Sequence, residues 1–134
     1  MKQRTIEDYL EVLYTLQSKS GSGVRCTDIA KALNIKKATV SETLKKLAAK
    51  GYVIAEPYSL IKLAPKGVKE AKKILFKHKT IEYFLKKVLK CDSKAIHREA
   101  HKLEHAFSDS TLTKLSRFLG NPKMIESEFH ASAD

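Results

Sequence analysis

The sequence contains none of the features expected of a secreted or membrane-spanning protein. No apolar run is long enough to cross a bilayer, and the first residues lack the pattern of a secretory signal peptide. There are two cysteines, Cys26 and Cys91, and they form no CxxC motif and indicate no disulfide framework. Each is expected to be a small buried or half-buried side chain. We therefore expect a cytoplasmic protein with no membrane partner.

Acidic residues are scarce relative to basic ones. The 134 residues include 26 Lys and Arg against 15 Asp and Glu, which gives a net charge of +11. Residues 1–76 hold 15 of the basic residues and 7 of the acidic ones, a net +8, whereas residues 77–134 hold 11 and 8, a net +3. This uneven excess favours a polyanionic partner, such as nucleic acid, that binds the N-terminal half.

Apolar residues recur at helical spacing in the N-terminal half. A first helix is expected over residues 5–18, with Thr5 as its N-cap. Thr27 is expected to cap a short helix over residues 28–33, and a tight turn leads to another helix over residues 37–50. Two helices joined by so short a turn predict a helix-turn-helix.

A hairpin is predicted directly after the helix-turn-helix. Residues 52–55 and 60–63 have the composition of two short strands around a turn, which is typical of a wing. The outward side chains of the preceding helix are suited to phosphates and base edges, whereas a winged helix used only for protein contacts would not need so basic a balance. The residues expected to face DNA are Lys37, Thr39, Ser41, Glu42, Lys45 and Lys46.

Three of the five histidines are spaced four residues apart in the C-terminal half. On a helix, His97, His101 and His105 would share one face, with Glu104 beside them. Neutral imidazole and carboxylate together form a ligand set for Mn, Fe(II), Zn or Ni, with no thiolate required. The alternative is three solvated surface histidines without a bound ion.

Two further helices flank this histidine-bearing helix. A long helix is expected over about residues 65–89, and it carries His78 and Glu82 four positions apart. These two residues could form a second imidazole–carboxylate pair, or His78 could be a packed core residue. A last helix, capped near Ser108, has more apolar surface than a small domain can cover, which predicts a homodimer. Its apolar residues are Leu112, Leu115, Phe118 and Leu119.

Several short segments together resemble the diphtheria toxin repressor family of metal-dependent transcriptional regulators, particularly its short manganese-regulator branch. Each segment is weak alone, but their order and spacing are specific. They are Glu7–Glu11, Asp28–Ser41, Leu63–Gly67, the pair His78 and Glu82, the pair Glu104 and His105, and Leu119–Pro122.

This resemblance implies a dimeric repressor that binds operator DNA when loaded with a divalent metal and controls metal homeostasis genes. We expect Mn(II) or Fe(II), with Zn(II) or others possible. By position, the ligands of one site would be Asp8, His101, Glu104 and His105, with Glu11 added in the manganese branch. A neighbouring site would use His78, Glu82 and His97.

The sequence departs from the family pattern at two points. His101 stands where the iron branch usually has Cys and the manganese branch Glu. A histidine keeps a ligand at this position but does not indicate which of the two metals is preferred. We also expect no SH3-like third domain. The expected fold is mainly α, with a winged helix-turn-helix domain over residues 1–70 and an all-helical metal-binding and dimerisation domain over residues 71–134.

Two other functions compete with this interpretation. Residues 101–105 fit H-x-x-E-H, the pattern of inverzincin metalloproteases, but half of the chain is a winged helix and no domain with a substrate cleft is evident, so we expect no enzyme. The stronger rival is a metal-independent winged-helix regulator, which would bind DNA equally well in the presence of a chelator.

Overall fold

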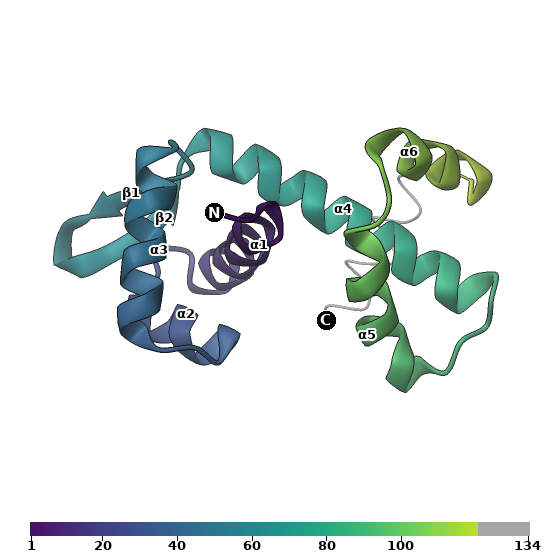
Figure 1. The fold of residues 1–134 in the computed structure, drawn as a ribbon, viewed down its shortest axis with the longest axis horizontal. Helices are drawn as coiled ribbons and strands as arrows, with labels where there is room; N and C mark the ends of the chain where they lie inside the picture. The colour runs from purple at the N-terminus through teal and green to yellow at the C-terminus, as the bar shows by residue number, and fades with distance from the viewer. Residues whose placement is uncertain (121–134) are drawn as a thin grey trace. The chain divides into compact units, whose positions relative to one another are not determined.

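The computed structural model describes residues 1–120, and every structural statement below concerns this range. It contains six α-helices and one two-stranded antiparallel sheet, in the order drawn in Figure 1. The chain divides into two units, of which the first is Met1–Ile74 and the second begins at Leu75. The mainly helical fold class is confirmed, with the winged helix-turn-helix in the first unit and helices in the second.

Three helices form most of the first unit. They are α1 (Gln3–Ser20), α2 (Cys26–Leu33) and α3 (Lys37–Ala49). Asn34 ends α2 in the left-handed conformation, with φ 55°, and so makes the tight turn to α3. One apolar core joins all three helices to the sheet and includes Leu10, Leu13, Ile29, Val40 and Leu47.

The two threonine caps expected in this unit are wrong. Lys2 and Arg25 occupy the N-cap positions of α1 and α2, and neither makes a capping hydrogen bond through its side chain. For α2 the reason is tertiary: Val24 is bridged to Ile61 by two backbone hydrogen bonds of 2.7 and 2.8 Å. These bonds hold the chain extended up to the cap, so the helix starts before Thr27.

The wing follows α3 as expected. Strands β1 (Val53–Glu56) and β2 (Leu60–Leu63) pair antiparallel, with Val53 opposite Leu63. A single 3-10 turn at Pro57–Ser59 joins them, and Tyr58 at its centre has φ 65° and is 93% exposed. This turn type places an aromatic side chain at the tip of the wing.

Helix α4 (Pro65–Lys87) begins against the link between α3 and β1. The amide of Ala64 donates to the carbonyl of Tyr52 at 2.9 Å, and Gly67 lies so near that carbonyl that an added Cβ would overlap it. The boundary between the two units, after Ile74, falls inside this helix. The division at residue 70 stays a prediction.

The second unit packs α5 (Ser93–Glu104) and α6 (Asp109–Phe118) with α4 around a small apolar core. Asp92 caps α5 and Ser108 caps α6, as expected. The core consists of Ile81, Leu85, Ile96, Ala100 and Leu112, with half-buried Phe76, Phe84, Cys91, Leu103 and Phe107 around it.

Two expectations for this unit need correction. Helix α5 ends at Glu104, so His105 lies at its C-cap and not within a longer helix. Phe118 was expected to face inward with Leu112, but it is 74% exposed. Cys26 and Cys91 are half-buried, as expected, and both are free cysteines. No helix within residues 1–120 has the length and apolar character needed to cross a membrane.

Candidate metal centre and nucleic-acid interface

Glu104 is buried because of its place in the packing stripe of α5. Ile96, Ala100 and Glu104 are four residues apart, so they form one row on the helix, and the first two face the core. Glu104 therefore stands where another apolar residue would continue the row, and it is 2% exposed. A carboxylate in such a position must find polar partners or bind a cation.

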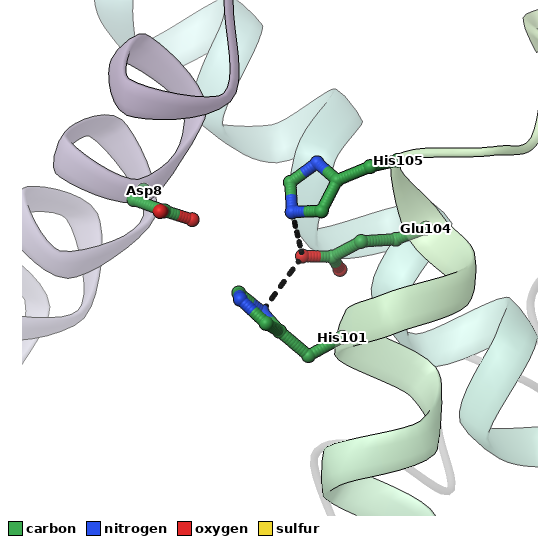
Figure 2. A group of neighbouring side chains, drawn as sticks. All are labelled: Asp8, His101, Glu104 and His105. Carbon is green, nitrogen blue, oxygen red and sulfur yellow. Dashed lines mark ion pairs between the residues drawn. The ribbon is translucent and has the colours of Figure 1, made fainter.

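Two imidazoles of the same segment face one oxygen of this carboxylate. His101 Nδ1 lies 3.2 Å and His105 Nε2 lies 3.6 Å from Glu104 Oε1. Dashed lines mark both ion pairs in Figure 2. Within the described residues, Oε1 is buried without a hydrogen bond of good geometry. One ligand atom from each of the three side chains lies within 4.8 Å of the others.

This arrangement fits a divalent metal ion. Ligand atoms that each lie about 2 Å from one ion are separated from one another by roughly 3–4 Å. The three side chains offer two imidazole nitrogens and a carboxylate oxygen, a set that suits first-row divalent ions without thiolate. The buried oxygen without a well-aligned donor is the point at which a cation would be accommodated most directly.

The other oxygen of Glu104 is bound from α4. His78 Nδ1 lies 2.6 Å from Glu104 Oε2, and His78 Nε2 lies 2.6 Å from Glu82 Oε1. His78 continues a core row of α4 that includes Ala71, Ile74 and Ile81, and it is 2% exposed. The histidine is thus a packed core residue and a partner of two carboxylates at once.

The two carboxylates determine the charge of this histidine. Burial alone would lower the pKa of His78, but the hydrogen bonds to Glu104 and Glu82 raise it to about 9. Burial would raise the pKa of Glu82, but the hydrogen bond to His78 lowers it to about 2. Before a metal ion binds, His78 is therefore an imidazolium and Glu82 a carboxylate at neutral pH.

Glu82 also faces His97 of α5. His97 Nδ1 lies 3.3 Å from Glu82 Oε1, and the rings of His78 and His97 meet edge to face with their centroids 5.2 Å apart. His97 is 81% exposed, and Lys79 Nζ reaches the other oxygen of Glu82 at 3.2 Å. The structure thus brings His78, Glu82 and His97 together as a second candidate group.

The remaining metal-site residues expected from the sequence lie on α1 of the first unit. Asp8, which is also drawn in Figure 2, and Glu11 are three positions apart on that helix, and both are half-buried. Their participation in a site with His101, Glu104 and His105 remains a proposal.

The candidate DNA-facing residues are distributed along α3 as expected from its periodicity. Val40, Leu44 and Leu47 face the core, so the opposite side of the helix is left to solvent. Ser41 is half-buried and the other five are exposed, namely Lys37, Thr39, Glu42, Lys45 and Lys46.

Two lysines with defined contacts were not anticipated from the sequence. Lys66 Nζ donates to the carbonyl of Lys50 at 2.8 Å and lies 4.4 Å from the centre of the Tyr52 ring. Lys77 Nζ donates to the carbonyl of Phe107 at 2.6 Å. No local signal could have identified them, because they are two among many lysines in α4 and their partners are distant in sequence.

Comparison with family models decides the relationship of the chain. The model described as "Iron dependent repressor, N-terminal DNA binding domain" matches residues 1–61, and that described as "Iron dependent repressor, metal binding and dimerisation domain" matches residues 64–126. The chain belongs to the iron-dependent repressor family. The predicted resemblance to the diphtheria toxin repressor family and its short manganese-regulator branch is thereby confirmed.

Curated relatives match nearly the whole chain. An uncharacterized HTH-type transcriptional regulator of Methanocaldococcus jannaschii is 48% identical over 87% of this chain and 93% of its own length. The HTH-type transcriptional regulator MntR of Lysinibacillus sphaericus is 30% identical over 87% of this chain and 82% of its own.

Solved structures agree with this relationship. The apo form of the manganese-activated repressor ScaR is 32% identical, with a TM-score of 0.76, over 85% of this chain and 54% of that one. ScaR has also been solved with bound Zn2+ and with bound Cd2+. The chain thus spans about half the length of this solved relative.

Membership in this family defines the general class of function. Its members are metal-dependent transcriptional regulators with a DNA-binding domain and a domain for metal binding and dimerisation. The chain is therefore a regulator and not an enzyme, and H-x-x-E-H at residues 101–105 is not a protease motif here. The cofactor of the family is a divalent metal ion.

Proposed function

We propose that this chain is a cytoplasmic repressor that binds operator DNA as a homodimer when loaded with Mn(II) or Fe(II), and that it controls metal homeostasis genes. The observation that carries the proposal is the buried carboxylate of Glu104, which faces the imidazoles of His101 in α5 and of His105 at its C-cap. A thiolate-free set of this kind suits the harder divalent ions, although Zn(II) binds such ligands more tightly in the usual affinity order.

The proposed ligands come from both units of the chain. His101, Glu104 and His105 would hold one ion together with Asp8 and Glu11 of α1, and the second group is His78, Glu82 and His97. When bound, the ion supplies positive charge that offsets the repulsion among these carboxylates. With that repulsion removed, Asp8 and Glu11 hold α1 in a fixed orientation.

Helix α1 can pass this constraint to the DNA-binding elements. Its residues Leu10 and Leu13 are buried in the same apolar core as Ile29 of α2 and Val40 of α3. A change in the position of α1 therefore displaces the helix-turn-helix that packs on it. Metal binding and DNA binding are linked through this core and must affect each other reciprocally.

The outward face of α3 would read the operator. Lys37, Lys45 and Lys46 contribute phosphate contacts, whereas Glu42 can accept a hydrogen bond from a cytosine amino group. Thr39 and Ser41 can bond to either base edges or phosphates. Two such helices related by a two-fold axis would read half-sites about one helical turn, or a multiple of a turn, apart.

The proposal is tested by fluorescence anisotropy on upstream DNA, with Mn(II), Fe(II), Zn(II) or a chelator present. We expect tight, sequence-specific binding with Mn(II) or Fe(II) and weak, salt-sensitive binding with the chelator. Equal affinity with metal and with chelator would establish the metal-independent regulator instead. His105→Ala should abolish the metal response, because it removes a ligand, and leave the weak binding intact.

The dimer has its own measurement. Phe118 of α6 is 74% exposed, and Val88 and Leu89 after α4 are 44% and 55% exposed, so these side chains are available for a partner subunit to cover. Light scattering of the metal-loaded protein at micromolar concentration should give twice the mass of the chain. A monomeric mass under these conditions would contradict the proposed assembly.

A further inference from the structure

A short turn connects α5 to α6 and carries one of the candidate metal ligands. It runs from His105, at the C-cap of α5, to Ser108, the N-cap of α6. The amides of Ala106 and Phe107 both donate to the carbonyl of Leu103, at 2.9 and 3.2 Å. These bonds continue the last turn of the helix, but they leave the carbonyls that follow without partners in that helix.

A lysine of α4 binds one of these carbonyls. Lys77 Nζ donates to the carbonyl oxygen of Phe107 at 2.6 Å, and the bond is partly buried. Lysine side chains commonly satisfy carbonyls beyond the end of a helix, where the helix dipole also favours a positive charge. Here the lysine belongs to a different helix, so the bond links α4 to the turn.

The bond made by Lys77 is paired with one made by the next residue of α4. His78 Nδ1 lies 2.6 Å from Glu104 Oε2, and Lys77 Nζ lies 2.6 Å from the Phe107 carbonyl. Two consecutive residues of α4 are thus bonded to the residues one before and two after His105. His105 is held between the two attachment points, with its Nε2 3.6 Å from Glu104 Oε1.

We propose that Lys77 is a positioning residue of the metal centre, which fixes the turn that carries His105 so that its imidazole faces Glu104. Lys77 does not ligate the ion, since an ammonium group offers no lone pair. The inference rests on the proposed function, because it assumes that His105 and Glu104 bind a metal ion. It assigns a role to a residue outside both candidate ligand groups.

Charge and position make opposite predictions for this lysine. Its ammonium group repels a nearby cation, so on electrostatic grounds alone its removal would strengthen metal binding. If Lys77 positions His105, its removal loosens a ligand and weakens metal binding. The sign of the change therefore separates the positioning role from a role as one more positive charge.

The experiment measures Mn(II) affinity by competition with a fluorescent chelator for the wild type, Lys77→Met, Lys77→Arg and Lys86→Met. Lys86 is an exposed lysine of the same helix and serves as the matched control for charge. We expect Lys77→Met to weaken Mn(II) binding roughly 10-fold, the lower end of losses for groups that orient ligands. Lys77→Arg should restore most of the affinity, because it retains a donor, and Lys86→Met should leave the affinity within error.

The outcomes distinguish this inference from the proposed function. If the wild type binds Mn(II) and Lys77→Met binds it equally well or more tightly, the positioning role is overturned. Failure of the wild type to bind Mn(II) overturns the proposed function instead. If Lys77→Met does not fold, NMR of the metal-free wild type decides: a protected ammonium signal of Lys77 supports the bond, and its absence overturns the inference.

Discussion

Each carboxylate oxygen of Glu104 faces a different group of partners. Oε2 is bonded to His78, whereas Oε1 faces His101 and His105. The side chain therefore joins the two candidate metal groups, and its charge belongs to both. A residue in such a position contributes more to metal affinity than an exposed ligand that water can replace.

Replacing the carboxylate of Glu104 with a neutral amide should severely weaken metal binding. Glu104→Gln should weaken Mn(II) binding by at least about 100-fold, because losing a direct ligand costs no less than losing a group that only orients ligands. Glu99→Gln is the matched control, since Glu99 lies on the same helix and pairs with Lys102 at 3.8 Å, away from the histidines. Calorimetric titration measures both, and similar affinities for the two variants would count against Glu104 as a ligand.

The raised pKa of His78 predicts that metal uptake releases a proton. With the pKa at about 9, the metal-free imidazole is protonated near neutral pH, and an ion that uses its Nε2 must displace a proton. Metal affinity should therefore rise with pH up to about pH 9 and fall as the pH decreases. Calorimetry near pH 7.5 in two buffers of different ionisation enthalpy should show release of about one proton per ion at this group. Identical enthalpies in the two buffers would contradict the prediction.

Spacing along the sequence predicted that three histidines share one helix face, but it did not predict which carboxylates they contact. The four-residue spacing of His97, His101 and His105 placed them near one face of α5, as found. The structure divides them, with His97 toward Glu82 and the other two toward Glu104. Local periodicity could not reveal this division, because it depends on α4, whose residues lie more than a dozen positions away.

At the scale of elements, the start of α4 packs closely against the link between α3 and β1. A Cβ at Gly67 would overlap the carbonyl of Tyr52, which is already fixed by the amide of Ala64. Gly67→Ala should therefore destabilise the protein by about 3 kcal/mol or more, since neither backbone can move easily. Denaturant unfolding of the metal-free chain measures this free energy.

Gly21→Ala provides the comparison for that variant. Gly21 has φ +70° but open space around it, so its substitution costs only the left-handed conformation, about 1–2 kcal/mol. The expected order is a larger loss for Gly67→Ala. If the two variants are equally stable, the close approach of α4 to Tyr52 is not a real constraint.

The outward face of α3 predicts two kinds of DNA defect. Lys45→Ala should weaken binding to every DNA sequence about equally and make the salt dependence shallower by roughly one unit, because one phosphate contact is lost.

Glu42→Ala should instead relax the base preference at one position in each half-site. Anisotropy titrations on operator and random DNA measure both. If Glu42→Ala loses as much affinity for random DNA as for the operator, Glu42 is excluded as a base contact.

The sequence predicted most elements correctly and some of their ends incorrectly. Asp92 and Ser108 cap their helices because their side chains accept from backbone amides two and three residues later. Thr5 and Thr27 do not cap, since the starts of α1 and α2 lie two residues and one residue earlier. For α2 a bridge to the distant Ile61 decides the start, and such a contact leaves no local pattern.

At the scale of the whole molecule, the proposed switch requires ligands from both units. Asp8 and Glu11 lie on α1, which packs with the helix-turn-helix, whereas Glu104 and His105 lie in the second unit. An ion that uses both sets joins the part of the chain that reads DNA to the part that holds most of the ligands. The sequence suggested this division only through the family resemblance, because the two ligand sets are separated by some ninety residues.

The most direct test is the affinity of the wild type for Mn(II), measured with and without saturating operator DNA. Reciprocity requires the operator to tighten Mn(II) binding, by about 5- to 150-fold for a coupling of about 1–3 kcal/mol. Random DNA of equal length is the control for electrostatic attraction of the ion, and Asp8→Ala should lose most of the coupling. An Mn(II) affinity that is the same with operator, with random DNA and without DNA would contradict the claim that metal binding switches DNA binding.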